Sequence, residues 1–217
     1  MTVKIKICGI RHEEEALFCD QNKVDFLGFN FFSGSSRYIS LEKAKDLIPK
    51  LNFPIPVGLF VNEKLDKVLE IISLTGIKIA QFHGQETPEF LSQIPIPAIK
   101  SFGIETEEDL REVSEYDEVA DFFLFDKKSK KFGGTGESFS WEILLGQNFN
   151  KPFFLAGGVN IKNIPRIEKY FSPPNPQPPT PNPQLFAIDG ASGSETDGKK
   201  DFTKISQIIS LTKKLFL

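Results

Sequence analysis

Short β-forming runs alternate with stretches of helical spacing eight times along this chain of 217 residues. A strand followed by a helix, repeated, requires right-handed crossovers between parallel strands, and eight such units can close into a barrel with no exposed sheet edge. We therefore expect an α/β fold, a single (β/α)8 TIM barrel that spans residues 1–217 as one domain. The expected strands are residues 4–7, 26–31, 57–61, 77–82, 98–102, 122–125, 153–155 and 185–188.

The stretches between these runs carry apolar residues at helical spacing. Leu65, Val68, Leu69 and Ile72 stand at positions i, i+3, i+4 and i+7, and residues 205–216 repeat the pattern. Each of these helices should therefore have one apolar face. An open, doubly wound sheet is the alternative arrangement, but it would leave long hydrophobic edges on a short chain, which favours the closed barrel.

One segment interrupts the alternation. Residues 172–184 are rich in proline, which suits neither a helix interior nor an inner strand. The segment falls between the seventh helix and the eighth strand, so we expect a solvated loop insertion on the face opposite the usual active-site mouth of a barrel. A proline-rich ligand for a partner domain is the alternative interpretation.

Charge and composition narrow the choice of partners. The formal net charge of -3 gives no long-range attraction for nucleic acid or anionic lipid, so an anionic ligand would be small and held by a local site. The N-terminus lacks the continuous apolar stretch of a signal peptide, and no run reaches the ~18 apolar residues that span a bilayer. We expect a cytoplasmic protein without nucleic-acid or membrane partners, with free thiols at Cys8 and Cys19. The sequence leaves open whether a protein partner exists.

Functional side chains of a (β/α)8 barrel lie at the carboxyl ends of the strands. Cys8 follows the first expected strand and Asp126 follows the sixth. Taken singly, a cysteine is often a small buried hydrophobe, and an aspartate often caps a turn or a helix. Their joint position at opposite sides of one mouth indicates instead that both take part in chemistry.

Glycine clusters follow the sixth, seventh and eighth strands. Glycine lets backbone N–H groups approach an anion, and the loops after strands seven and eight are the common phosphate site of this fold. Because glycine also serves plain turns, one cluster would mean little, but two in the phosphate-binding quarter predict a small phosphorylated ligand. The clusters are residues 133–136 with Gly134, the pair Gly157 and Gly158, and residues 190–194 with Ser192 and Gly193.

Two further side chains at strand ends suit an organic substrate. Arg37, after the second strand, carries a planar guanidinium that can hold a carboxylate through two hydrogen bonds, although its position alone fits a surface arginine equally well. His83 follows the fourth strand, whereas the other histidine, His12, opens the first helix and should be exposed. No third His, Cys or carboxylate joins His83 at metal-ligand spacing, so we expect no metal.

Eleven short motifs occur in order along the chain: KICGI at residues 6–10, GFNF at 28–31, SRYI at 36–39, VGLFVN at 57–62, QFHG at 81–84, FD at 125–126, GGTG at 133–136, FSW at 139–141, LAGG at 155–158, DGASGSE at 189–195 and GKKD at 198–201. Together they resemble the motifs of phosphoribosylanthranilate isomerases over almost the whole chain. The resemblance implies a cofactor-free isomerase of tryptophan biosynthesis. Its reaction is the Amadori rearrangement of N-(5-phospho-β-D-ribosyl)anthranilate to 1-(2-carboxyphenylamino)-1-deoxy-D-ribulose 5-phosphate.

The resemblance also implies roles for individual residues. Cys8 would be the general base, Asp126 the general acid, and Arg37 the residue that holds the anthranilate carboxylate. His83 and Asp189 would line the substrate pocket. The phosphate would bind at Gly134, Gly157, Gly158, Ser192 and Gly193.

After the eighth strand the chain departs from the family pattern. The family reads Asp-Val-Ser-Ser-Gly-Val-Glu, whereas this chain has Gly190, Ala191 and Ser194 in place of the first valine, the first serine and the second valine. The change removes one hydroxyl and adds a glycine in the expected phosphate loop, while Ser194 supplies a hydroxyl two residues beyond Ser192.

Two other functions remain as alternatives. The isomerase of histidine biosynthesis performs the same kind of rearrangement on a related barrel but uses an aspartate as its base, and Cys8 argues against it. A non-catalytic phosphate-binding barrel would need neither Cys8 nor Asp126, and the chain has both.

Overall fold

Eight parallel strands close into a barrel in the computed structural model, which describes residues 2–128, 139–171 and 185–216. Each strand is hydrogen-bonded to the next in chain order, and β8 pairs with β1. The predicted barrel and all eight predicted strands are thereby confirmed. The strands are β1 (Lys4–Cys8), β2 (Phe26–Asn30), β3 (Ile55–Phe60), β4 (Ile79–Phe82), β5 (Ala98–Ile104), β6 (Phe122–Lys127), β7 (Phe153–Leu155) and β8 (Leu185–Gly190).

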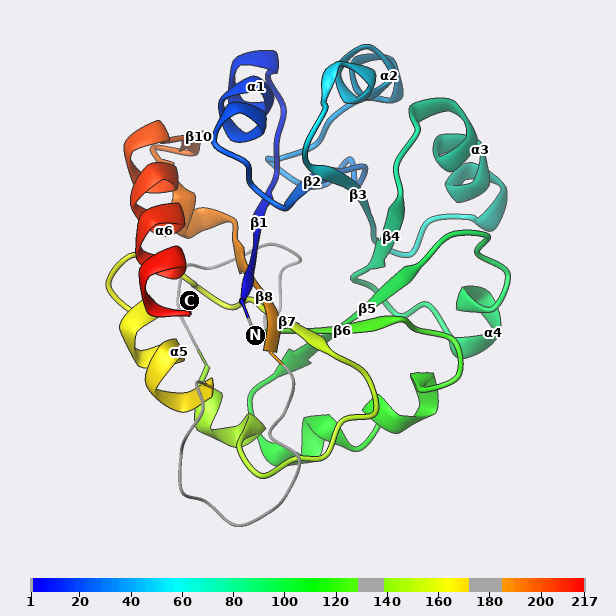
Figure 1. Ribbon diagram of the computed structural model, residues 1–217. Helices are drawn as coiled ribbons and strands as arrows, with labels where there is room; N and C mark the ends of the chain where they lie inside the picture. Colours follow the sequence, from blue (N-terminus) through cyan, green and yellow to red (C-terminus); the bar gives the residue numbers. More distant parts are fainter. Residues whose placement is uncertain (1, 129–138, 172–184, 217) are drawn as a thin grey trace.

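The α-helices of the described chain form a ring outside the strands (Figure 1). Local signals in the sequence set several of their ends. The Ser40 and Asp201 side chains accept hydrogen bonds from the first turns of α2 and α6, and Gly76, with φ of 76°, ends α3 in a left-handed conformation. The helices are α1 (Glu13–Gln21), α2 (Leu41–Leu47), α3 (Leu65–Thr75), α4 (Pro88–Leu91), α5 (Ile164–Phe171) and α6 (Phe202–Leu215).

The connection after β5 differs from the expected strand–helix unit. It consists of two short 3-10 helices, Glu107–Leu110 and Val113–Tyr116, and of no α-helix. Acidic side chains recur three and four residues apart through residues 105–118, and like charges at those spacings destabilise an α-helix. The described residues between β6 and β7 also contain a 3-10 helix, Trp141–Leu144.

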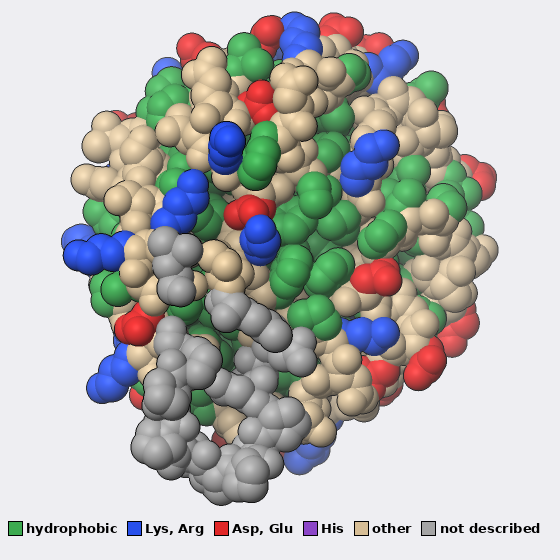
Figure 2. Space-filling view, in the orientation of Figure 1, with side chains coloured by type: hydrophobic (Ala, Val, Ile, Leu, Met, Phe, Trp, Pro, Cys, Tyr) green, Lys and Arg blue, Asp and Glu red, His purple; other side chains and the backbone are tan. Residues whose placement is uncertain are grey.

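Successive side chains of each strand point alternately into and out of the barrel. One apolar cluster fills the barrel, and a larger one packs between the strands and the helices. Figure 2 shows hydrophobic side chains gathered near the middle of one end of the molecule, with most charged side chains around them. The interior is therefore a packed core rather than a pore. The inner cluster consists of Phe26, Val57, Ile79, Ile99, Leu124, Phe154, Ala156 and Ala187.

A short antiparallel hairpin between β8 and α6 has no counterpart among the expected elements. It consists of β9 (Glu195–Thr196) and β10 (Lys199–Lys200), and its register places Lys200 opposite Glu195. Asp197 and Gly198 form the turn with φ of 51° and 73°. Two left-handed residues in the order Asp-Gly are the preferred connection for such a hairpin, so the sequence does contain a local signal for it.

The expected proline-rich insertion at residues 172–184 lies outside the described residues. Its flanking elements are α5 and β8, so it does connect a helix to the following strand. Within the part of the chain that the structure describes, no helix is long and apolar enough to cross a membrane.

Candidate active site

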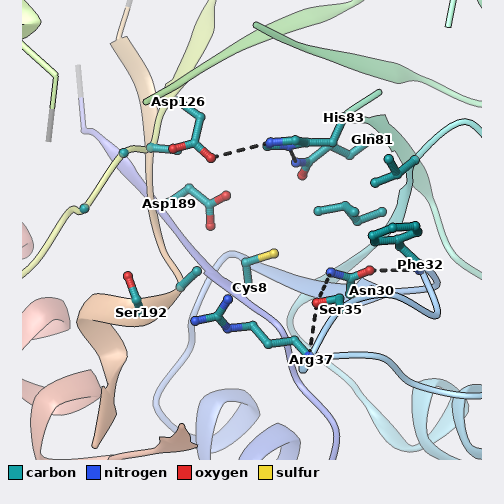
Figure 3. Close-up of a pocket in the computed structure, with 16 residues that line it drawn as sticks. Cys8, Asn30, Phe32, Ser35, Arg37, Gln81, His83, Asp126, Asp189 and Ser192 are labelled. Atoms are coloured by element: carbon teal, nitrogen blue, oxygen red, sulfur yellow. Dashed lines mark hydrogen bonds and ion pairs between the residues drawn. The ribbon is translucent and has the colours of Figure 1, made fainter. Parts of the chain in front are cut away.

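A cavity of about 670 Å³, including the solvent at its mouth, opens where the strands β1 to β4 and β6 to β8 end (Figure 3). Of the residues expected at the site, Cys8, Arg37, His83, Asp126, Gly157, Gly158, Asp189 and Ser192 all line it. The structure thus brings together side chains that are up to 184 positions apart in the sequence, from Cys8 to Ser192. The other lining residues are Asn30, Phe32, Ser35, Leu59, Val61, Gln81, Ala156 and Ala191.

Cys8 ends β1 and is buried, with its sulfur pointing into the cavity (Figure 3). Gly28 on the neighbouring strand makes room for the thiol, since a Cβ at position 28 would come within 2.7 Å of the Cys8 Sγ. Burial raises the pKa of the Cys8 thiol above its ordinary value, and the ammonium groups of Lys6 and Lys200 oppose that rise. The thiol is therefore held close to two cations that favour its ionised form.

Asp126 lies across the cavity from Cys8 (Figure 3). One of its oxygens, Oδ2, is 3.6 Å from His83 Nε2, and the other, Oδ1, accepts a 2.7 Å hydrogen bond from the backbone N–H of Lys127. Burial raises the pKa of the Asp126 carboxyl, although His83 and this hydrogen bond act in the opposite direction. A carboxyl of raised pKa is suited to carry a proton that it can donate.

Lys6, which the sequence did not single out as a functional residue, lies beneath the cavity with its side chain completely buried. It stands opposite Asp189 in the pairing of β1 with β8, and its Nζ donates a 2.7 Å hydrogen bond to Asp189 Oδ2. Burial alone would lower the pKa of Lys6, but the charge of Asp189 and the neighbouring Cys8 raise it. The other oxygen, Asp189 Oδ1, is buried without a hydrogen-bond partner in the described structure, and it belongs to a residue that lines the cavity.

Replacing Lys6 by methionine should lower the free energy of unfolding by about 3–5 kcal/mol, because it leaves the Asp189 carboxylate buried and unpaired. Lys4→Met, two residues earlier on the same strand, is the matched control. Lys4 pairs with Asp25 at 3.0 Å but its side chain is 45% exposed, so its loss should cost about 0–1 kcal/mol. Urea unfolding followed by circular dichroism measures both, and equal losses would contradict the assignment of a buried ion pair.

Arg37 is held by a bidentate ion pair with Glu195. Its Nε and Nη2 donate hydrogen bonds of 2.8 and 2.7 Å to the two carboxylate oxygens, and these bonds raise the pKa of the guanidinium. The side chain also packs on Gly9, where an added Cβ would lie 2.4 Å from the Arg37 Cδ and where φ is 87°. Because Glu195 occupies the side of the guanidinium that carries Nε, the N–H groups on the Nη1 side remain available for a substrate carboxylate.

The residues expected to bind phosphate have three different locations in the structure. Gly157 and Gly158, with φ of 73° and 76°, line the cavity together with Ser192. Gly193 packs against the loop after β7, where an added Cβ would lie 1.9 Å from the Val159 carbonyl oxygen. Gly134 lies outside the described residues.

Several polar residues of the site were not predicted as functional. Gln81 is buried, and its Nε2 lies 3.3 Å from both His83 Nδ1 and Ser101 Oγ. Gln81 lies on β4, and His83, two residues later, follows that strand, a spacing that could have indicated that both face the cavity. Asn30 donates to Ser35 Oγ, a contact that organises the loop before Arg37. Among the described residues, no group of three His, Cys, Asp or Glu side chains is arranged to hold a metal ion.

Comparison with known proteins identifies the family. The model of the N-(5'-phosphoribosyl)anthranilate isomerase family matches residues 5–211. The chain belongs to this isomerase family. As a member, it is an isomerase of tryptophan biosynthesis, which confirms the resemblance stated from the motifs.

Individual relatives agree with this assignment. The N-(5'-phosphoribosyl)anthranilate isomerase of Thermoanaerobacter sp. is 37% identical over 210 residues, which cover 95% of this chain and 96% of the relative. The crystal structure of the isomerase from Thermotoga maritima superposes with a TM-score of 0.85 at 34% identity, covering 98% of this chain and 100% of that chain. A second isomerase structure, with a TM-score of 0.82, 32% identity and the same coverage, is a complex with reduced 1-(o-carboxyphenylamino)-1-deoxyribulose 5-phosphate.

Proposed function

We propose that the chain catalyses the Amadori rearrangement of N-(5'-phosphoribosyl)anthranilate with Cys8 as general base and Asp126 as general acid. The observation that carries these roles is the position of a buried thiol and a largely buried carboxyl, with a side chain that is 19% exposed, on opposite walls of one cavity. A substrate between them would meet one group on each side. The reaction needs one proton donor and one proton acceptor, and no redox carrier or other cofactor takes part.

Two proton transfers account for the rearrangement. Asp126 donates its proton to the furanose ring oxygen as the bond from that oxygen to C1 breaks, and the nitrogen lone pair forms the C1=N bond of a Schiff base. Cys8 then removes the proton from C2, and the electron pair of the C2–H bond forms a C1=C2 enolamine as the C=N electrons return to nitrogen. Tautomerisation of the enolamine to the C2 ketone adds a proton to C1 and releases one from the C2 hydroxyl, which returns Cys8 and Asp126 to their starting protonation states. Atoms balance, and no electrons leave the substrate.

The surroundings of the two groups support these roles. Asp126 must hold a proton in the free enzyme, and burial raises its pKa in that direction. Cys8 must lose a proton although burial raises its pKa, so the positive charges of Lys6 and Lys200 matter for the base. The iminium charge that forms on the substrate after ring opening would further favour the thiolate.

The phosphate and the carboxylate of the substrate would bind at separate places in the cavity. The phosphate would bind at the loops after β7 and β8, at Gly157, Gly158, Ser192 and Gly193, with Gly134 included on the family resemblance. The anthranilate carboxylate would bind the free edge of Arg37. The relative whose structure contains a reduced carboxyphenylamino-deoxyribulose 5-phosphate supports a phosphorylated ligand of this kind. The buried free thiols Cys8 and Cys19 are compatible with a reducing compartment, and we place the reaction in the cytoplasm.

Arg37→Ala should raise KM by about 10- to 150-fold, because a charge-assisted hydrogen-bonded contact contributes about 1.5–3 kcal/mol. Arg37→Lys should recover only part of the loss, since an ammonium lacks the planar fork. Steady-state kinetics measure both variants. An Arg37→Ala protein that bound substrate and product as well as the unmodified chain would contradict the carboxylate assignment.

Gly193→Ala should weaken phosphate binding by about 5- to 150-fold, since overpacking typically costs about 1–3 kcal/mol and the new Cβ would collide with the Val159 main chain. Gly190→Ala, at the end of β8 three residues earlier, is the matched control. A Cβ at position 190 meets its nearest atoms at 3.6 Å, an ordinary contact distance. Competitive inhibition by inorganic phosphate measures the effect, and equal inhibition constants for the two variants would argue against a phosphate site built on this contact.

A turnover assay with N-(5'-phosphoribosyl)anthranilate tests the proposed function as a whole. The predicted result is stoichiometric formation of the carboxyphenylamino-deoxyribulose 5-phosphate without added cofactor. Running the histidine-pathway aminoaldose in parallel separates the two isomerase activities. Binding of the phosphorylated substrate without turnover would favour the non-catalytic barrel instead.

A further inference from the structure

The Lys200 ammonium is buried under the rim of the site, with a side chain that is 1% exposed. Its Nζ lies 2.6 Å from the Cys8 carbonyl oxygen and 2.9 Å from Glu195 Oε1. It lies 3.1 Å from Ser194 Oγ and 3.2 Å from the Ala191 carbonyl oxygen. An ammonium has three hydrogens to donate, so these four acceptors account for its full capacity. Lys200 is not among the described residues that line the cavity.

The partners of Lys200 belong to three parts of the site. The Cys8 carbonyl is the main chain of the proposed base. Glu195 holds Arg37, the proposed carboxylate anchor, through two hydrogen bonds of 2.7–2.8 Å. Ala191 lines the cavity beside Ser192 of the proposed phosphate loop. One buried cation is therefore in contact with the supports of the base, the carboxylate anchor and the phosphate loop.

The hairpin between β8 and α6 explains how these contacts arise. Its two-residue turn sets a register in which Glu195 and Lys200 stand directly opposite each other, so their side chains meet on one face. Arg11, at the end of the β1–α1 loop, donates hydrogen bonds of 2.7 and 2.8 Å to the Ser36 and Gly198 carbonyl oxygens. The hairpin is thereby joined to the loop that carries Arg37.

Charge at this cluster is balanced by close pairing. Burial favours the neutral form of Glu195, but the hydrogen bond from Arg37 and the charge of Lys200 outweigh it and lower the pKa of the carboxyl. Glu195 is thus an anion between two cations. An anion shared in this way restricts the guanidinium to one orientation, because both of its oxygens are engaged by Arg37 in a fork-to-fork geometry.

We propose that Lys200 and Glu195 are positioning residues of the isomerisation, which set Arg37 and the main chain of Cys8 at a defined spacing across the substrate. The proposal rests on the roles assigned above to Arg37 and Cys8. Glu195 acts through Arg37 and therefore on substrate binding. Lys200 acts through Glu195 and also through the Cys8 carbonyl, so it affects both binding and proton abstraction.

The first test is a double-mutant cycle between Glu195→Gln and Arg37→Ala. Glu195→Gln keeps the size of the side chain and should raise KM by about 10-fold or more, because it loosens the charge-assisted contact to Arg37, with a much smaller change in kcat. In the Arg37→Ala background the same substitution should change KM little, since the residue through which it acts is gone. Independent, multiplicative effects on KM would overturn the positioning role of Glu195.

The second test is Lys200→Met, with Lys199→Met on the same strand as its matched control. Lys199 is exposed, and Lys199→Met should leave both KM and kcat unchanged. Lys200→Met should raise KM and lower kcat, each by about 10-fold or more. Wild-type constants in a folded Lys200→Met protein would overturn the proposal. If circular dichroism shows that Lys200→Met does not fold, the double-mutant cycle between Glu195→Gln and Arg37→Ala tests the proposal instead.

A third measurement distinguishes positioning from a merely structural role. The rate at which iodoacetamide alkylates Cys8, followed by peptide mass spectrometry across pH, reports the ionisation of the thiol among Lys6, Asp189, Arg37 and Lys200. Lys200→Met removes one positive charge and should move this profile to higher pH, whereas Lys199→Met should not. An unmoved profile would contradict the link between Lys200 and Cys8. Normal kinetics in Cys8→Ala or Arg37→Ala would instead refute the proposed function on which the inference rests.

Discussion

Cys8→Ala is expected to lower kcat by about 10²–10⁴-fold, the usual contribution of a positioned proton-transfer group. The thiol lines the cavity and is the residue assigned to remove the C2 proton. Loss of one sulfur from a small buried side chain should leave the barrel folded, so KM should change far less than kcat. Steady-state kinetics with circular dichroism on the same samples measure both expectations.

Cys19→Ala is the control for the loss of a buried thiol. Cys19 is completely buried in α1, away from the residues that line the cavity, and burial raises its pKa to about 12. Its replacement should leave kcat unchanged. A folded Cys8→Ala protein with near-normal turnover would refute the assignment of the base, while the fold and family would stand.

Asp126→Asn should lower kcat by about 10²–10⁴-fold as well, because an amide has no acidic proton for the ring oxygen. The substitution keeps the shape of the side chain, and the carbonyl oxygen can still accept the hydrogen bond from the Lys127 N–H. Phosphate binding should therefore persist. Inhibition by inorganic phosphate, measured beside kcat, checks this separation.

The His83→Asn variant distinguishes the contribution of Asp126 from that of the neighbouring histidine. His83 Nε2 lies 3.6 Å from Asp126 Oδ2 and is one of the influences that lower the Asp126 pKa. Its removal should weaken activity less than the removal of Asp126, since the proton donor remains. A larger loss from His83→Asn than from Asp126→Asn would show that the histidine, rather than the carboxyl, is the group that delivers the proton.

The strands of this barrel could be predicted from the sequence because their signals are local. Parallel strands covered on both faces are short runs of apolar residues, and β7 matches the predicted residues 153–155 without change. The meeting of Cys8, Arg37, His83 and Asp126 at one cavity could be predicted because a barrel gathers the residues that follow its strands at one end. Such a prediction requires only the position of each residue relative to a strand, and not the residues that it contacts.

The supporting contacts could not be predicted in the same way. Lys6 is a charged residue between Ile5 and Ile7, and its partner Asp189 is 183 residues away. The sequence around each residue does not indicate that β1 and β8 place Lys6 and Asp189 opposite each other, because this pairing arises only when the barrel closes. Likewise, Glu195 engages the Arg37 guanidinium, which a strand-end argument leaves free for the substrate. The Asp-Gly turn at residues 197–198 was the one local signal that could have revealed the hairpin.

The dependence of kcat/KM on pH, compared among the unmodified chain, Cys8→Ala and Asp126→Asn, tests the acid–base pair most directly, since this constant reports ionisations of the free enzyme. In the proposed mechanism the active form has a Cys8 thiolate and a protonated Asp126 carboxyl, so the unmodified chain should give a bell-shaped profile whose limbs belong to the pair. In Asp126→Asn only the thiolate is needed, so the rate should rise with pH and keep rising above pH 9, because burial holds the Cys8 pKa above its ordinary value of 9.0. In Cys8→Ala only the protonated carboxyl is needed, so the residual rate should be highest at low pH and fall through the raised pKa of Asp126. Two folded variants that both kept the bell-shaped profile, merely scaled down, would contradict the account.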